Sequence, residues 1–151
     1  LMDQLRESVV HVRAIARGLF PVEIDANGLK AALVDLARQT RERYGVDCDC
    51  QFRNDAVVSD NNAATHLFRI AQEAVSNAVR HGNPQRILIH LEAEGPHFRL
   101  EVEDDGSGMD HSQTTRSGIG LSIMGYRARM IDAVLEIESA ESGGVRVICT
   151  R

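Results

Sequence analysis

Two turn signals constrain the fold of this chain more than any other feature of its sequence. Gly95-Pro96 lies between two segments with the alternation typical of strands, and Ser142-Gly143-Gly144 lies between two more. Glycine and proline at such positions indicate tight connections between neighbouring strands. With one further strand earlier in the chain, the predicted strands cover residues 46–53, 86–94, 97–104, 134–139 and 145–149.

Helical patterns alternate with these strands. Apolar side chains recur at steps of three and four in residues 28–44, 63–79 and 121–131. The resulting order is helix, strand, helix, two strands, helix, two strands. It suits a mixed sheet with helices on one face. The expected fold class is therefore α/β, a two-layer α/β sandwich.

Residues 1–20 show a stricter helical pattern. Their apolar positions are spaced 3, 4, 3, 4 and 3 residues apart, and they are Met2, Leu5, Val9, Val12, Ala16 and Leu19. This spacing keeps one seam of a helix facing a partner helix, as in a bundle or coiled coil. A helix packed on its own domain is the alternative. Pro21 is expected to end it, because proline lacks an amide proton.

Composition excludes some functions. The net charge is −5 and Lys30 is the only lysine, which argues against a nucleic-acid surface. The three cysteines are an odd number without a spaced framework, which favours a reducing cytoplasm and buried thiols in strands rather than zinc. No apolar run approaches the ~20 residues of a membrane span. We therefore expect a cytoplasmic domain that does not cross a membrane.

The helix predicted at 63–79 has a polar face opposite its apolar stripe. Spacings of three and four place these residues on that face: His66, Arg69, Glu73, Asn77 and Arg80. A solvated surface explains most of them. Asn77 is unusual, because asparagine is a poor residue inside a helix. Its amide oxygen is a hard donor of the kind that Mg²⁺ prefers, and Arg80 and His81 could meet phosphate oxygens.

Two glycine motifs follow. In Asp104-Asp105-Gly106-Ser107-Gly108, glycines directly after a strand allow close approach of a ligand, and Asp104 could accept from the amine of adenine. A plain Asp-Gly turn is the alternative. Gly118-Ile119-Gly120-Leu121 opens a helix, where free amides can bind phosphate, although a simple helix start explains it as well. Neither a full dinucleotide fingerprint nor a Walker A motif is present.

The order of these motifs resembles the Bergerat ATP-binding fold, which gyrase, heat-shock chaperone ATPases, mismatch-repair ATPases and histidine kinases share. The finer resemblance is to sensor histidine kinases of the nitrate/nitrite-sensor type. Residues 68–82, 102–109 and 117–131 resemble their N, G1 and G2 boxes, and residues 135–147 resemble their closing hairpin. Residues 16–33 resemble the junction between the dimerisation and catalytic domains.

The resemblance implies a role for each motif. Asn77 would coordinate the Mg²⁺ bridging the ATP phosphates, Glu73 would lie near the γ-phosphate, and Asp104 would accept from the adenine amine. Residues 105–117 would form the ATP lid. Arg80 and His81 would contact the phosphates, and Gly106 and Gly108 would leave room for the base. Met109 would pack against the adenine ring. The phosphates would be lined by Gly118, Gly120 and the Leu121 amide.

Two departures from the family pattern matter. Val145 stands where the closing hairpin usually carries a threonine that supports the adenine site. The phosphoacceptor histidine belongs to the first dimerisation helix, whose motif is absent. His11 falls on the match to the second helix and is not expected to accept phosphate.

The resemblance therefore implies that residues 1–22 end a dimerisation helix and residues 23–151 form an ATP-binding catalytic domain. This domain would transfer the γ-phosphoryl group of ATP to a histidine elsewhere in a dimer. The expected partners are ATP, the phosphoacceptor helix of the same protein and a response regulator, with no nucleic acid. We expect the chain to bind Mg-ATP without phosphorylating itself.

Three alternatives stay open. An ATP hydrolase of the same fold would use Glu73 to activate water. A serine kinase of the anti-sigma-factor type would act on a small protein. The heptad pattern of residues 1–20 favours a histidine kinase over both. A dimerisation module with a decayed ATP site is disfavoured, because Glu73, Asn77 and Asp104 are all present.

Overall fold

The structure, a computed structural model, describes residues 2, 4, 24, 28–109 and 118–151. Apart from residues 2 and 4, which are helical, the predicted leading helix lies outside the described residues, as do the domain boundary at residue 22, His11 and most of the predicted lid. The elements are α2 (Gly28–Tyr44), β1 (Asp47–Arg53), α3 (Asn61–Asn77), η1 (Ala78–Gly82), β2 (Arg86–Glu94), β3 (His97–Asp104), α4 (Gly118–Met130), β4 (Val134–Ser139) and β5 (Val145–Thr150).

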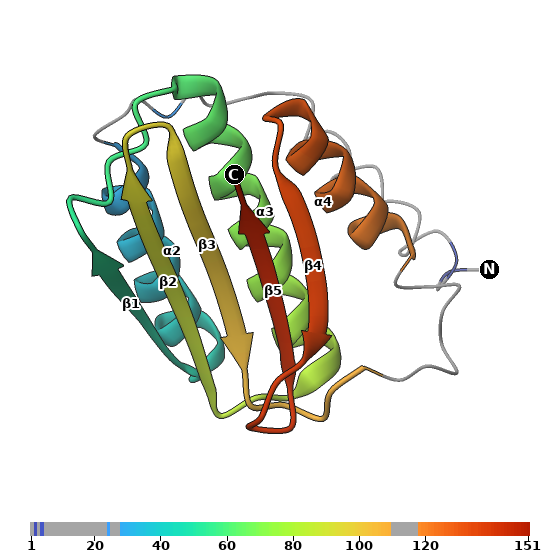
Figure 1. The fold of residues 1–151 in the computed structure, drawn as a ribbon. Coiled ribbons are helices and arrows are strands. Elements are labelled where there is room, and N and C mark those ends of the chain that lie inside the picture. The colour runs from blue at the N-terminus through green and yellow to red at the C-terminus, as the bar shows by residue number, and fades with distance from the viewer. Residues whose placement is uncertain (1, 3, 5–23, 25–27, 110–117) are drawn as a thin grey trace.

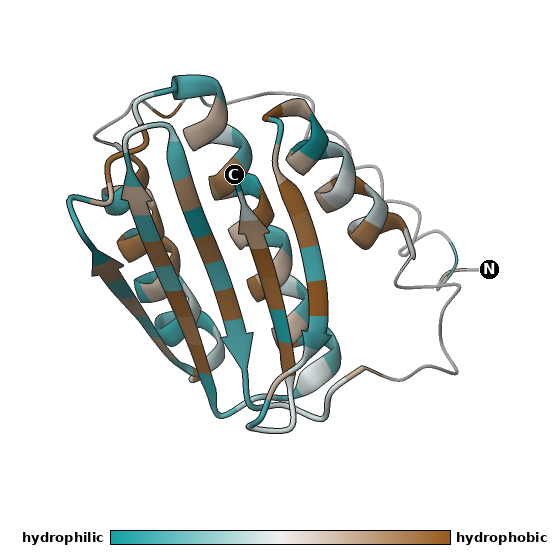
Figure 2. Cartoon of the chain, viewed as in Figure 1, coloured by the Kyte–Doolittle hydropathy of each residue, from teal (hydrophilic) through white to brown (hydrophobic). Residues whose placement is uncertain are grey.

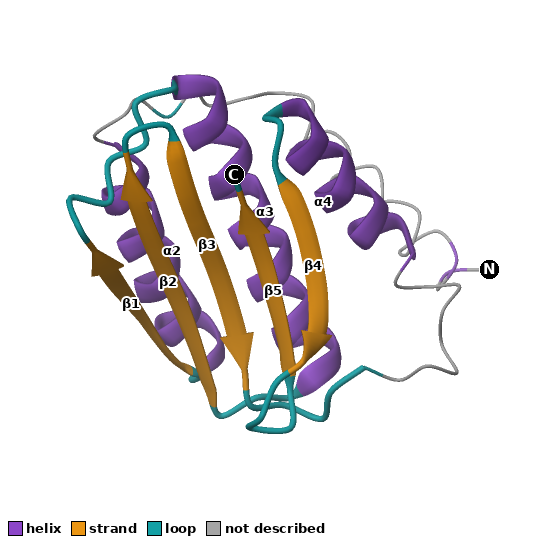
Figure 3. Ribbon diagram, in the orientation of Figure 1, coloured by secondary structure: helices purple, strands orange, loops and turns teal. Residues whose placement is uncertain are grey.

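The five strands form one sheet in the order β1-β2-β3-β5-β4. β1 pairs with β2 in parallel, and the other three pairings are antiparallel. Helices α2, α3 and α4 lie on the same face of this sheet (Figures 1 and 3). The predicted two-layer α/β sandwich with a mixed sheet is confirmed.

The core lies between the helices and the sheet. In β2 every second side chain is buried against the helices, which gives the banding of polar and apolar residues along the strands in Figure 2. α3 contributes Leu67 and Ile70 together with small alanines, and Met124 comes from α4. The small alanine side chains allow α3 to pack closely on the sheet, which fixes the distance of its polar face from the strands.

The bounds of two helices differ from the prediction. α3 begins at Asn61 rather than at residue 63, because the Asp60 carboxylate caps it by accepting from the amides of Asn62 (2.9 Å) and Ala63 (3.2 Å). Its α-helical part ends at Asn77, and the chain continues as the wider π-helical turn η1. α4 begins at Gly118 rather than at residue 121, so the glycine motif forms its first turn.

The three thiols lie in strands, as predicted. Cys48 and Cys149 are buried and Cys50 is half-buried, and all three are free. Burial raises the pKa of the Cys48 thiol to about 12 and that of Cys149 to about 11. These thiols are therefore protonated at neutral pH and poorly nucleophilic.

The described residues contain neither a membrane-spanning helix nor a cluster of metal-ligating side chains. None of their helices is both long enough and apolar enough to cross a bilayer. They also contain no cluster of three or more His, Cys, Asp or Glu side chains that could hold a metal ion.

Candidate nucleotide-binding site

One edge of the sheet gathers three segments that are far apart in sequence. The C-terminal end of β3, the η1 turn and the connection between β4 and β5 all lie at the lower edge in Figure 1. Asp104 is the last residue of β3, and η1 follows Asn77 directly. The Asp104–Gly108 motif and the end of the helix that carries Glu73 and Asn77 therefore lie at this same edge.

The η1 turn brings the end of the helix against the glycine loop. Gly82 accepts from the Ser107 amide at 2.8 Å, and the Ser107 hydroxyl donates to the His81 carbonyl at 3.3 Å. A Cβ on Gly106 would collide with the Gly82 backbone and lie 2.9 Å from Asp104 Oδ1. Only glycine fits there, so the two backbones pack directly on each other. Single π turns in α-helices are frequent at functional sites.

Asp104 is the most deeply buried acidic side chain of the described residues, with 6% of its surface exposed. Its Oδ1 accepts from the Gly106 amide at 2.8 Å, and the Val145 amide also donates to the carboxylate. Desolvation by burial raises the pKa of Asp104, although these two bonds lower it. Ionisation of Asp104 is therefore harder in the folded protein than in the unfolded chain. Retaining such a group in the fold is typical of a functional site.

The connection between β4 and β5 closes around Asp104. A Cβ on Gly144 would overlap the Asp104 carbonyl oxygen, and the Ser142 hydroxyl donates to that oxygen at 3.1 Å. Gly108, at a φ of +82°, lies in the left-handed region, and a Cβ there would be 2.8 Å from the Gly143 carbonyl. Val145 lacks the hydroxyl of the expected threonine, but its backbone amide reaches Asp104 directly.

Asp105 has a structural role that the sequence prediction missed. Its Oδ1 accepts from the amides of both Gln85 and Arg86 at 2.8 Å, and its own amide donates to the Arg86 carbonyl at 3.2 Å. The side chain thus ties the glycine loop to the start of β2. The tendency of aspartate to bond nearby backbone amides in turns was the available signal, but these partners lie 19 and 20 residues away.

The start of α4 packs against the polar face of α3. A Cβ on Gly120 would collide with Glu73 Oε1 and would lie 3.6 Å from Asn77 Nδ2. Glu73 and Asn77 are both half-buried. The structure therefore brings together Glu73, Asn77 and Gly120. The first four amides of a helix have no partner within it, and those of α4 begin at Gly118.

A cationic group lies further along the interface of α3 and α4. Arg127 Nη1 of α4 is 3.4 Å from His66 Nδ1 of α3. Desolvation lowers the pKa of Arg69 and of Arg127, and the charge of Arg69 lowers that of Arg127 further, whereas Glu73 raises it. Arg127 lies in the helix predicted at residues 121–131. Its approach to α3 could not be read from one helix alone.

The remaining predicted residues are placed less tightly. Arg80 and His81 are exposed, and the Arg80 guanidinium donates to the Ser76 hydroxyl at 2.6 Å from Nη2 and 3.0 Å from Nε. Met109 is half-buried, and Leu121 packs against the core. The side chain of Arg80 therefore lies along α3 in this structure.

Comparison with known proteins agrees with this arrangement. Residues 62–150 match the family model of histidine kinase-, DNA gyrase B-, and HSP90-like ATPases. Among curated relatives, the sensor histidine kinase LiaS of Bacillus subtilis (strain 168) is 33% identical over 141 residues, covering 93% of this chain and 39% of LiaS.

Two solved structures share the fold. The histidine kinase domain of the Erythrobacter litoralis EL346 blue-light activated histidine kinase aligns with a TM-score of 0.63 at 21% identity, over 81% of this chain and 59% of that one. The ATP-binding domain of PrrB from Mycobacterium tuberculosis aligns with a TM-score of 0.59 at 20% identity, over 85% and 93%.

These matches define the class of the protein. The chain belongs to the family of histidine kinase-, DNA gyrase B- and HSP90-like ATPases. Over most of its length the chain is similar to sensor histidine kinases such as LiaS. It spans about two fifths of the length of LiaS, 39%.

Two glycines at the start of α4 offer a matched test of the contact with Glu73. Nothing lies within 4 Å of a Cβ built on Gly118, whereas one on Gly120 would displace the Glu73 carboxylate. Gly118→Ala keeps its backbone amide and lies at the first position of α4, so it is expected to change the free energy of unfolding and the Mg-ATP affinity little. Gly120→Ala is expected to be less stable than Gly118→Ala and to bind Mg-ATP more weakly.

Urea unfolding and calorimetric titration of both variants measure these effects. Equal stability and equal Mg-ATP affinity in the two variants would show that Glu73 does not depend on the small residue at position 120.

Proposed function

We propose that this domain binds Mg-ATP at the edge formed by β3, η1 and the first turn of α4, and transfers the γ-phosphoryl group to a histidine of its own protein. The observation that carries the proposal is the buried Asp104 carboxylate beside Gly106, which packs on Gly82 at the end of the π turn that follows Asn77. A desolvated hydrogen-bond acceptor at one end of the site matches the base of a nucleotide. Oxygen atoms that can ligate a metal ion at the other end match its phosphates.

Asp104 is proposed to recognise the base. Two backbone amides already fix its carboxylate, so the remaining acceptor capacity can meet the exocyclic amine of adenine. Gly106 and Gly108 keep the neighbouring backbone free of side chains, and Met109 packs on the ring. A charge-assisted hydrogen bond in a desolvated site discriminates strongly between a donor and an acceptor on the ligand.

Asn77 and Glu73 are proposed to face the phosphates. The amide oxygen of Asn77 and the Glu73 carboxylate are hard donors on one half-buried face, which fits Mg²⁺ held by one protein oxygen together with phosphates and water. When bound, the ion would supply charge neutralisation on the phosphates. The amides at Gly118, Gly120 and Leu121 lie in the first turn of α4, where the helix dipole favours anions. Arg80 and His81 would add contacts, with Arg80 leaving Ser76.

The chain's own residues mainly position the reactants, as in other phosphoryl transfers. The imidazole nitrogen of the acceptor forms a bond to the γ-phosphorus as the bond to the leaving ADP oxygen breaks. Glu73 would polarise the imidazole by accepting its proton. The half-buried position of Glu73 beside Gly120 supports this role, because the carboxylate is held close to where phosphates would lie.

The remaining features follow from the sequence motifs. We propose that residues 1–22 end a dimerisation helix, that residues 23–151 are the catalytic domain, and that residues 105–117 form the lid over ATP. The parent protein would be a cytoplasmic or membrane-anchored sensor of the nitrate/nitrite-sensor type that phosphorylates a response regulator. The match of residues 68–82 and 117–131 to the boxes of that group supports this assignment.

Base recognition by Asp104 predicts discrimination between ADP and IDP, because inosine carries a carbonyl in place of the amine. IDP is expected to bind more weakly by on the order of 10–100-fold, the loss of one charged hydrogen bond. Asp104→Asn should weaken ADP binding and lower the ratio of the IDP to the ADP dissociation constant. The side-chain amide nitrogen of the new asparagine can donate to the carbonyl of the inosine base.

Isothermal titration of both nucleotides into both proteins measures the ratio. Equal affinity of the unmodified chain for ADP and IDP would remove Asp104 from base recognition, whatever the variant does.

Metal coordination by Asn77 predicts a specific loss. Asn77→Ala should abolish most of the gain in ATP affinity on adding Mg²⁺ and leave metal-free ATP binding nearly unchanged. Asn62→Ala, an exposed asparagine at the opposite end of α3, is the matched control. Titrations with MgCl₂ or EDTA check this. A full magnesium effect in Asn77→Ala would exclude Asn77 as the ligand.

A further inference from the structure

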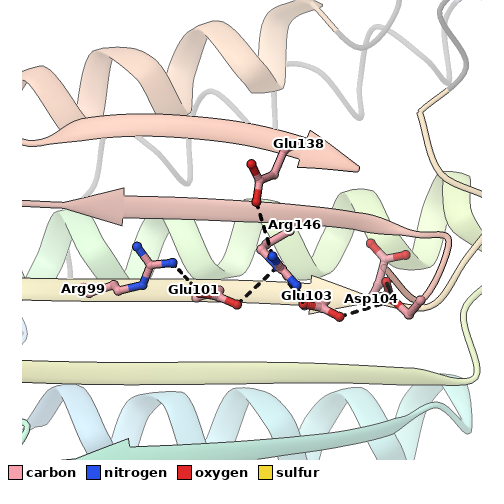
Figure 4. A network of polar contacts seen from close by, with 7 residues as sticks. Arg99, Glu101, Glu103, Asp104, Glu138 and Arg146 are labelled. Carbon is pink, nitrogen blue, oxygen red and sulfur yellow. Dashed lines mark hydrogen bonds and ion pairs between the residues drawn. The ribbon is translucent and has the colours of Figure 1, made fainter. Parts of the chain in front are cut away.

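A polar network covers the face of the sheet that the helices leave open (Figure 4). At its centre is Arg146 of β5. Its Nε donates to Glu103 Oε2 at 2.7 Å and lies 3.3 Å from Glu101 Oε1, and its Nη1 lies 3.3 Å from Glu138 Oε1. One guanidinium thus links three strands, β3, β5 and β4.

The strand register explains this geometry. Arg146 is directly opposite Glu103 of β3 on one side and Glu138 of β4 on the other. Directly opposed pairs of unlike charge stabilise neighbouring strands. The hydrogen bond with Glu103 is the main cause that raises the pKa of Arg146. Arg146 therefore fixes where the beginning of β5 lies relative to the end of β3.

The network continues to Asp104 in the proposed nucleotide site. The Ser142 Oγ lies 3.3 Å from Glu103 Oε1 and 3.1 Å from the Asp104 carbonyl oxygen, so its single proton can be donated to either. Arg146 follows Val145, whose amide donates to the Asp104 carboxylate, and its side chain holds the residue that precedes Asp104. Arg146 and the turn that contains Ser142 thus connect Glu103 and the backbone of Asp104 with Val145.

We propose that Arg146 is a positioning residue for base recognition. By holding Glu103 and Glu138 together, it keeps the turn between β4 and β5 closed on Asp104, so that the Val145 amide orients the carboxylate toward the base. The proposal rests on the proposed role of Asp104. It assigns to an arginine on the open face of the sheet an effect on the selectivity for adenine, exerted through the backbone of Val145.

Arg99 provides a matched control. It lies on the same face of β3, and its Nη2 contacts Glu101 Oε2 at 2.8 Å. It is opposite Thr150, at the other end of the β3–β5 pairing from Arg146. Arg99→Gln and Arg146→Gln change the net charge equally, and each removes one of the two arginine contacts of Glu101. Only the second releases Glu103, the residue bonded to Ser142.

The test is the ratio of IDP to ADP dissociation constants, which cancels most contacts with the phosphates. Arg146→Gln is expected to lower this ratio by about fivefold, equivalent to weakening one hydrogen bond. Arg99→Gln should leave it unchanged, and Arg146→Lys should recover part of it through a contact with Glu103. Urea unfolding confirms that each variant is folded. Loss of stability alone would not change the selectivity of the folded fraction.

An unchanged ratio in folded Arg146→Gln would overturn the inference, as would an equal fall in Arg99→Gln. If Arg146→Gln does not fold, Ser142→Ala tests the same link with Arg146 retained, and its ratio must fall for the inference to stand. Failure of the unmodified chain to distinguish ADP from IDP would instead contradict the role of Asp104. The two failures are therefore separable.

Discussion

The burial of the Asp104 carboxylate is the constraint on which the rest of this site depends. A carboxylate with 6% exposure needs donors from the protein, and here backbone amides of Gly106 and Val145 supply them. Both donors come from segments that must approach the end of β3 closely. Glycines at 106 and 144 make this approach possible, because any Cβ there would collide with backbone. Fold and site are thus set by the same contacts.

The second end of the site follows from the way α3 ends. The π turn η1 carries the chain from Asn77 to Gly82, which packs on Gly106. The small residue at position 120 lets the first turn of α4 rest on Glu73 and Asn77. The proposed base-binding and phosphate-binding groups are therefore connected through the five residues of η1 and the packing of Gly82 on Gly106. Such a link keeps the two ends of the site at a fixed separation, which positioning of a phosphoryl group requires.

Most of the fold could be predicted from local sequence patterns. Alternation predicted the bounds of β2, β3 and β4. Gly95-Pro96 and Gly143-Gly144 predicted the turns after β2 and β4, because these signals depend on neighbouring residues. The site residues Glu73, Asn77 and Asp104 were predicted from the order of motifs, and their roles stay a proposal. Contacts between distant segments were not predictable in this way. The bonds of Asp105 to Gln85 and Arg86 and the approach of Arg127 to His66 both depend on tertiary packing.

The central claim is that one ligand occupies both ends of this edge. The most direct measurement is an amide ¹H–¹⁵N spectrum of the labelled chain during titration with ADP. The account predicts that the amides of Gly106, Val145 and Gly120 shift together with a single dissociation constant. Shifts confined to α2 and β1, with these three amides unchanged, would contradict it.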